Sequence, residues 1–255
     1  MTNKAIEQQS ANLVDLRDMT DARVSLGRFG SGVPTRAMQI FLLDHARARD
    51  AVWSQVDHPA LDAAFADLPI DRIQVDSQAR DRASYVKRPD LGRILSVSSQ
   101  QLLSNAKHGV DVVIVVADGL SSSAVDINAA PLVFALVERL SNLKLSIGPL
   151  VIARQARVAI GDPIGETLGA TITIMLIGER PGLSAADSLG AYITHSPRTG
   201  MADSLRNCVS NIRDGGLPIE DAAETILGLI GQMLATGISG VGMRAAVARL
   251  KQPDP

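Results

Sequence analysis

The C-terminal part of the chain carries short apolar runs that alternate with longer amphipathic stretches. Residues 111–117 form a continuous run, mostly of valine and isoleucine, that ends in Asp118-Gly119-Leu120. Such a run is typical of a strand buried on both faces of a parallel sheet. The same pattern predicts further elements, namely strands at 150–153, 171–177 and 191–194 and helices at 122–140, 202–213 and 219–236. Strands that alternate with helices favour an open α/β sheet.

The N-terminal part shows a helical period instead. A glycine-rich loop at 27–35 precedes the clearest helical pattern in the chain, and Thr35 is placed to cap it. Pro59 follows about where this helix should end. The residues that fall near one stripe at helical spacing are Met38, Phe41, Leu42, His45, Val52, Trp53 and Val56. We therefore expect an amphipathic helix between the loop and Pro59.

The rest of the N-terminal part predicts shorter elements. Residues 60–68 and 91–106 favour helices, whereas the charged segment 71–89 favours an exposed crossover or interdomain segment. The pattern then changes from helical to strand-rich. We accordingly divide the chain into a helical N-terminal region, residues 1–106, and an α/β domain, residues 107–255.

Composition and charge exclude several function classes. The chain has 255 residues, of which 46% are hydrophobic and 20% are charged, as in globular proteins. A net charge of −2 and 3% aromatic residues offer neither the basic surface nor the stacking platforms expected of a nucleic-acid-binding protein. The sequence contains no apolar stretch of about 18 residues and no apolar signal-peptide core, so we expect no membrane partner.

Residues that could carry catalysis are few. The single cysteine, Cys208, excludes an intramolecular disulfide and a CxxC metal site. The four histidines, among them His195, show no metal-ligand spacing, and no nucleotide-binding or nucleophile-elbow motif is present. We therefore predict no catalytic residue and no metal ligand. A stand-alone α/β thiol enzyme using Cys208 and His195 stays open as an alternative, although a buried packing role is common for a free cysteine.

Turns rich in glycine, proline and charged residues cluster in the α/β domain. They lie at 157–166, 177–183, 187–192 and 206–213. In open α/β sheets, ligands bind beyond the carboxyl ends of the strands. Glu179 directly follows the strand at 171–177 and Gly178, so its carboxylate is placed to accept hydrogen bonds from ligand amides. A solvated carboxylate, or an ion pair with Arg180, is an equal alternative.

These segments, in this order, resemble the small (light) subunit of ethanolamine ammonia-lyase. The matching blocks are 27–35, 45–52, 118–121, 158–166, 176–183, 187–192 and 206–213. The resemblance extends from about residue 15 to about residue 250. It implies that the α/β domain is a Rossmann-like, mostly parallel sheet flanked by helices, and that the helical N-terminal region supplies partner contacts.

The resemblance also implies an activity. Enzymes of this family are adenosylcobalamin-dependent lyases that convert ethanolamine to acetaldehyde and ammonia by a radical mechanism. A separate large subunit carries the substrate site in a TIM barrel, and the small subunit completes the cobalamin site at the interface. The family forms large hetero-oligomers in the cytoplasm, often within bacterial microcompartments. The isolated chain is accordingly expected to be inactive, since the cofactor supplies the difficult chemistry and the protein binds and orients it.

By the same resemblance, Val158, Glu179 and Cys208 are expected to contact the cofactor. Val158 would pack on the corrin ring, Glu179 would accept hydrogen bonds from peripheral amides or a bound water, and Cys208 would approach by backbone or side chain. Weaker expectations of the same kind fall on Gly178, Arg180 and Asn207. The chain lacks the DxHxxG motif that supplies a histidine to cobalt, which implies base-on adenosylcobalamin. An assembly or scaffolding subunit without cofactor contact is the other alternative.

Overall fold

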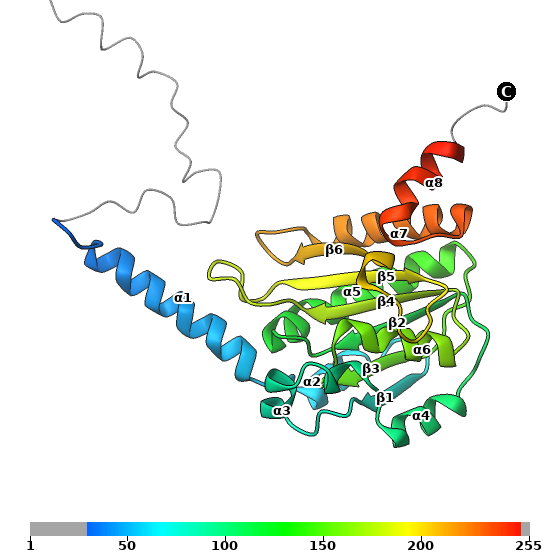
Figure 1. The fold of residues 1–255 in the computed structure, drawn as a ribbon, viewed down its shortest axis with the longest axis horizontal. Coiled ribbons are helices and arrows are strands. Elements are labelled where there is room, and N and C mark those ends of the chain that lie inside the picture. Colours follow the sequence, from blue (N-terminus) through cyan, green and yellow to red (C-terminus); the bar gives the residue numbers. More distant parts are fainter. Residues whose placement is uncertain (1–29, 251–255) are drawn as a thin grey trace, which may run out of the picture.

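The computed structural model describes residues 30–250, which build a mixed six-stranded sheet with flanking helices (Figure 1). The strands are β1 (Arg72–Asp76), β2 (Val112–Ala117), β3 (Leu150–Arg154), β4 (Ile172–Gly178), β5 (Leu189–His195) and β6 (Asn207–Ile212). Their order in the sheet is β1-β3-β2-β4-β5-β6. The first four run parallel, whereas β5 and β6 pair antiparallel with their neighbours. The predicted α/β class is confirmed, and the two antiparallel strands make the sheet mixed.

Helices cover both faces because the central strands are apolar on both sides. The longer helices are α1 (Thr35–Trp53), α2 (His58–Ala64), α3 (Arg82–Lys87), α4 (Val97–Ser104), α5 (Ser122–Asn142), α6 (Gly161–Thr167), α7 (Ile219–Thr236) and α8 (Met243–Leu250). Short 3₁₀ helices are η2 (Leu91–Arg93), η3 (Val158–Ile160), η4 (Asp203–Leu205) and η5 (Gly240–Gly242). Along β2, Val112, Ile114 and Val116 enter the core under α5 and α7, and the residues between them enter a second core with α6. The predicted two-sided burial of this strand is thus confirmed.

Two predicted elements are wrong. Residues 202–213 do not form a helix; they form η4 and β6, whose Val209 and Ile212 face the core. Pairing with β5 outweighs the weak helical period of this short segment. The charged segment 71–89 is not an exposed crossover, since it contains β1 and α3 and buries Arg82 and Tyr85. Its charge is compatible with burial because Arg82 donates hydrogen bonds to backbone carbonyls.

The sheet contains strands from both sides of the predicted domain boundary at residue 106. β1 pairs with β3 from Arg72↔Leu150 to Asp76↔Arg154. The predicted helix at 91–106 divides into η2 and α4, because Ser96 caps α4 by accepting a hydrogen bond from the backbone amide of Ser99. The division into residues 1–106 and 107–255 stays a prediction.

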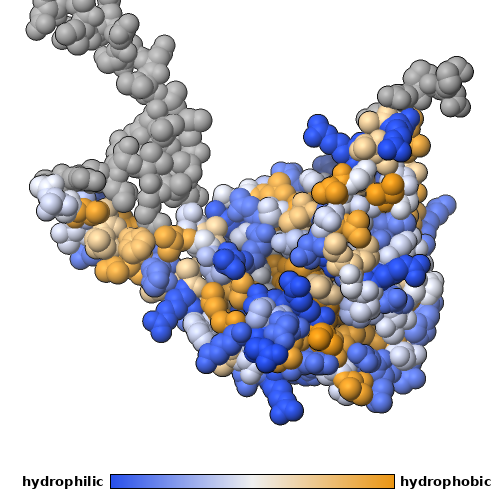
Figure 2. Space-filling view, in the orientation of Figure 1, coloured by the Kyte–Doolittle hydropathy of each residue, from blue (hydrophilic) through white to orange (hydrophobic). Residues whose placement is uncertain are grey.

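Helix α1 forms where the sequence places it, but its apolar side chains are not buried. Only Ala51 is buried, and the helix projects from the body of the molecule (Figure 1). Its exposed apolar residues, which include Leu42 at 57% exposure, give the orange surface of this helix in Figure 2. Pro34, not Thr35, occupies the N-cap, and no side-chain cap is formed. Residues 27–29 of the glycine-rich loop lie outside the described residues.

The described residues, 30–250, contain no single helix that is both long and apolar enough to cross a membrane. The bent pair formed by residues 219–236 and 240–250 passes that test of length and composition when both helices are counted together.

Candidate functional site

A pocket of about 400 Å³ opens at the carboxyl ends of β2, β3 and β4. After β2 the chain passes to α5 on one face of the sheet, and after β3 it passes to α6 on the other face. The connections that follow these strands therefore diverge at this point. Crevices of this kind are the usual ligand sites of open α/β sheets. The lining residues are Tyr85, Gly119, Leu120, Arg157, Val158, Ile177, Gly178, Glu179, Arg180 and Tyr192. Two predicted site residues, Val158 and Glu179, therefore share one pocket although 20 residues separate them.

The floor of the pocket is a close crossing of two glycines. Gly119 adopts φ +58°, and a Cβ added to it would overlap the carbonyl oxygen of Gly178. The amide of Leu120 donates a hydrogen bond of 2.8 Å to that same carbonyl. The ends of β2 and β4 can approach this closely only because neither glycine carries a side chain.

The carboxylate of Glu179 is fixed through one of its two oxygens. The Ser188 hydroxyl and the backbone amide of Asn211 both donate to Oε2, the latter at 3.1 Å. Within residues 30–250 no hydrogen bond to Oε1 is formed, nor an ion pair with Arg180. A Cβ on Gly190 would lie 3.0 Å from Oε1, so this glycine makes room for the carboxylate. Glu179 is thus oriented by the protein and keeps acceptor capacity for a ligand.

Cys208 lies one strand away from the lining residues. On β6 it pairs with Tyr192 of β5, which lines the pocket. Although the residue is exposed, desolvation by adjacent protein atoms raises the pKa of the thiol, the neighbouring Tyr192 hydroxyl lowers the pKa, and the charge of Glu179 raises it. Burial also raises the pKa of Tyr192 to about 12. Cys208 is therefore a protonated thiol near neutral pH.

Removal of the Glu179 charge is expected to make Cys208 more reactive. Glu179→Gln keeps a hydrogen-bond acceptor but lowers the pKa of the thiol, so alkylation by iodoacetamide at pH 7.5 should accelerate roughly two- to threefold, because the thiolate is the nucleophile. Mass spectrometry follows the rate. Glu138→Gln, on α5, is the control and should leave it unchanged. A slower reaction in Glu179→Gln would contradict the electrostatic coupling.

The arrangement gives no support to a thiol–histidine pair. His195 stands at the far end of β5, three residues beyond Tyr192, the partner of Cys208 in the sheet. Its ring is hydrogen-bonded to Ser196, and burial lowers its pKa. Among residues 30–250 no group of three or more acidic, histidine or cysteine side chains could hold a metal ion.

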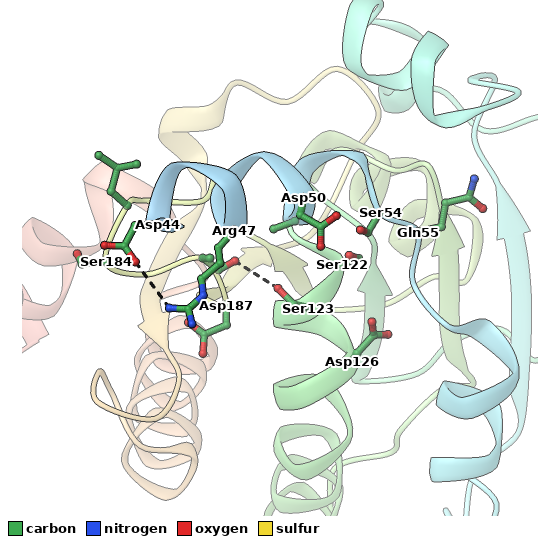
Figure 3. Close-up of a pocket in the computed structure, with 13 residues that line it drawn as sticks. Asp44, Arg47, Asp50, Ser54, Gln55, Ser122, Ser123, Asp126, Ser184 and Asp187 are labelled. Atoms are coloured by element: carbon green, nitrogen blue, oxygen red, sulfur yellow. Dashed lines mark hydrogen bonds and ion pairs between the residues drawn. The ribbon is translucent and has the colours of Figure 1, made fainter. Parts of the chain in front are cut away.

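A larger pocket of about 570 Å³ lies between α1, the start of α5 and the loop from β4 to β5 (Figure 3). Asp44, Asp50, Asp126 and Asp187 contribute carboxylates to it, and Arg47 a guanidinium. Another, of about 650 Å³, lies at the amino ends of β1 and β3, beside Pro69 and Pro149. Neither of these two pockets contains a predicted site residue. The smaller pocket at the carboxyl ends of the strands, called the strand-end pocket below, is therefore identified as the candidate site by its lining residues and not by its size.

Of the three weaker predictions, two line the pocket and one makes a structural hydrogen bond elsewhere. Gly178 and Arg180 line the pocket, whereas the side chain of Asn207 accepts a hydrogen bond of 2.6 Å from the backbone amide of Gly240. Sequence reasoning missed Tyr85, Arg157 and Tyr192 as lining residues. The only sequence signal for them was the rarity of tyrosine, because the chain has two tyrosines and both line this pocket.

Tyr85 fixes the wall that carries Val158. Its hydroxyl donates to the carbonyl of Ala156 at 3.0 Å, and burial raises its pKa to about 12. The turn after β3 is held further because Asp118, at the end of β2, accepts a hydrogen bond of 2.7 Å from the amide of Gln155. Burial raises the pKa of Asp118, a carboxylate that supports the turn rather than facing the pocket.

Comparison with known proteins gives one consistent result. The family model described as ethanolamine ammonia-lyase light chain matches residues 10–244. The chain is 49% identical over 234 residues to the ethanolamine ammonia-lyase small subunit of Rhodopseudomonas palustris (strain BisA53), which covers 91% of this chain and 90% of that protein. It is 48% identical over 233 residues to the small subunit of Bradyrhizobium diazoefficiens, covering 91% and 89%. With this similarity along nearly its whole length, the chain belongs to the ethanolamine ammonia-lyase light-chain family.

Proposed function

We propose that this chain is the small subunit of an adenosylcobalamin-dependent ethanolamine ammonia-lyase and completes the cobalamin site at an interface with the large catalytic subunit. The observation that carries the proposal is the convergence of Val158 and Glu179 on one strand-end pocket, with Cys208 paired in the sheet to another lining residue, Tyr192. As in the family, the proposal includes assembly into a hetero-oligomer and a location in the cytoplasm or within a bacterial microcompartment.

The residues of the pocket fit such a cofactor. Val158 and Ile177 offer apolar contact, and Oε1 of Glu179 offers an acceptor for amide groups. Gly119 and Gly178 keep the floor free of side chains. When bound, the cofactor, in the base-on form, supplies the radical chemistry, while this chain binds it, orients it and limits access of water.

The size of the pocket favours a shared site. Pockets that enclose a drug-sized ligand occupy about 300–1,000 Å³, and a corrin cofactor is larger than such a ligand. A pocket of about 400 Å³ in this chain can therefore cover only part of it. We infer that the large subunit covers the rest, which also accounts for the lack of a catalytic set in this chain.

Helix α1 is suited to contact that subunit. Between Met38 and Leu43 apolar side chains point to several sides of the helix, and Met38, Ile40, Leu42 and Leu43 are all exposed. Exposed apolar residues gathered on one segment mark a surface that contacts other protein. A large partner can enclose it, whereas a single second helix would cover only one stripe.

Charge on α1 is expected to weaken assembly. Leu42→Glu places a carboxylate in an interface that excludes water and should raise the dissociation constant for the large subunit at least about tenfold. Ile127→Glu, on α5, is the matched control, because both side chains are 57% exposed. Sedimentation or interferometry measures the affinity. Equal affinities of the two variants would contradict a docking role for α1.

Cobalamin retention tests the function directly. The chain, the large subunit and their complex are each incubated with cobalamin, freed of excess cofactor and examined for corrin absorption. We expect retention by the complex and about tenfold weaker binding after Glu179→Ala or Val158→Asp, each of which removes a pocket contact. Glu224→Ala, an exposed carboxylate on α7, should have no effect. Unchanged binding in both pocket variants would favour an assembly subunit without cofactor contact.

A further inference from the structure

The ring of Tyr85 lies between two arginines that play different parts. Arg157 stacks on it with Cζ 4.3 Å from the ring centroid, and Arg82 with Cζ at 4.9 Å. Arg82 is buried and donates to the carbonyls of Val52, at 2.7 Å, and Gly119, at 2.9 Å. Arg82 therefore belongs to the framework. Arg157 is only half-buried and lines the strand-end pocket beside Val158.

Arg157 is held in place before any ligand arrives. Its amide donates to the carbonyl of Gly92 at 2.8 Å, and its Nη2 donates to the carbonyl of Tyr85 at 3.3 Å. A Cβ on Gly92 would come within 2.9 Å of the Arg157 Cγ, so this glycine makes room for the side chain. The guanidinium is thus an oriented set of donors.

The hydrogen-bonding capacity of this guanidinium is incompletely used. Its Nε is buried and has no hydrogen-bond partner. A buried donor without a partner is unfavourable. Because Nε is closed off from solvent, a ligand in the pocket would reach the guanidinium through its Nη atoms, of which Nη2 already donates to Tyr85.

We propose that Arg157 donates hydrogen bonds to the carbonyl oxygen of ligand carboxamide groups, and that together with Glu179 it makes the pocket select uncharged carboxamides over carboxylates. A primary carboxamide both accepts and donates, which matches a fixed donor and a fixed acceptor in one pocket. A carboxylate would be attracted by Arg157 but repelled by Glu179. The inference rests on the proposed function, since the peripheral carboxamides belong to the corrin.

Two corrinoids test this selectivity. Cyanocobalamin and a cobalamin monocarboxylic acid, in which one peripheral carboxamide is hydrolysed, are titrated by absorbance against the complex of the full chain with the large subunit. Arg157→Met should bind cyanocobalamin about tenfold more weakly and the acid more weakly still, so that the preference for the amide rises. Glu179→Gln should lower that preference. Arg154→Met, which alters an exposed pair with Asp76 outside the pocket, should change neither.

The outcomes separate this inference from the proposed function. If Arg157→Met binds both corrinoids like the unaltered complex, Arg157 is only structural and the inference is overturned, while the proposed function stands. If the unaltered complex binds no corrinoid, both are overturned. Thermal unfolding shows whether Arg157→Met is folded. If it is not, Arg157→Lys keeps the charge without the planar fork and should bind cyanocobalamin more weakly at a nearly unchanged preference; full affinity would overturn the inference.

Discussion

Replacement of Gly119 by alanine is expected to lower the free energy of unfolding by about 3 kcal/mol and to abolish measurable cobalamin binding by the complex. A non-glycine residue at positive φ costs about 1–2 kcal/mol. The added methyl group also overlaps the backbone of Gly178, and such overpacking costs about 1–3 kcal/mol. Because the two glycines form the floor of the pocket, relief of the overlap must separate the ends of β2 and β4.

A second glycine supplies the control for this result. Gly228 lies exposed within α7, and a Cβ added there meets nothing within 4 Å. Gly228→Ala should therefore stabilise the chain by about 0.5–1 kcal/mol. Urea unfolding followed by circular dichroism measures both variants. Equal stabilities of Gly119→Ala and the unaltered chain would show that the two strand ends are not held at this distance.

The parts of the fold that sequence could predict are those in which the pattern of apolar residues matches the pattern of burial. β2 is a continuous apolar run and β4 is apolar except for Thr173, and the ends of both strands lie within one residue of the predicted 111–117 and 171–177. The helix predicted at 219–236 has the same bounds as α7. In these segments local pattern and tertiary burial demand the same structure, so either one suffices.

Sequence failed where a distant segment decides the local structure. The strand that carries Cys208 exists because β5 offers it a partner, and β5 and β6 are joined through a register shift that no local pattern encodes. Tyr85 is buried with the guanidinium groups of both Arg82 and Arg157 over its ring, and Arg157 lies 72 residues away in the chain. The helix α1 was predicted, but this chain alone does not bury its apolar side chains.

The candidate site shows the same division. Glu179 could be placed from the strand that precedes it, because the end of a buried strand is locally readable. Arg157 stands next to Val158 in sequence, yet its orientation depends on Tyr85, from the segment predicted to be an exposed crossover, and on Gly92, from the predicted helix at 91–106. Chain position could not reveal that contact.

Replacement of Arg206 by methionine is expected to lower the free energy of unfolding at pH 7 by about 3–5 kcal/mol, because it leaves a buried carboxylate without its cation. The side chains of Arg206 and Asp162 are only 2% and 3% exposed, and they form an ion pair. Arg206 also donates to Asp203 at 2.7 Å. Arg139→Met is the matched control, since its pair with Glu220 is exposed and should contribute less than about 1 kcal/mol.

The pH dependence distinguishes this cause from a simple packing defect. Burial raises the pKa of Asp162 to about 6, while Arg206 opposes that rise. The folded chain therefore binds a proton more tightly than the unfolded chain, so this group makes stability fall as pH rises from about 4 to about 6. Without Arg206 the pKa of Asp162 rises further, and acidification should recover more stability in Arg206→Met than in the unaltered chain. Urea unfolding at pH 5 and pH 7 measures the difference, and equal losses at both values would contradict the electrostatic cause.

The place of this ion pair in the chain explains why its loss should reach the site. Asp162 lies in α6, four residues after Val158, and Arg206 lies two residues before Cys208. The pair therefore joins the turn that carries one proposed cofactor contact to the strand that carries another. Cobalamin binding by Arg206→Met should weaken even under conditions in which the variant is folded. The double variant Arg206→Met with Asp162→Asn removes both charges, so it should regain stability more completely than it regains affinity for cobalamin. Affinity that returns in full with stability would show that the pair supports the fold alone.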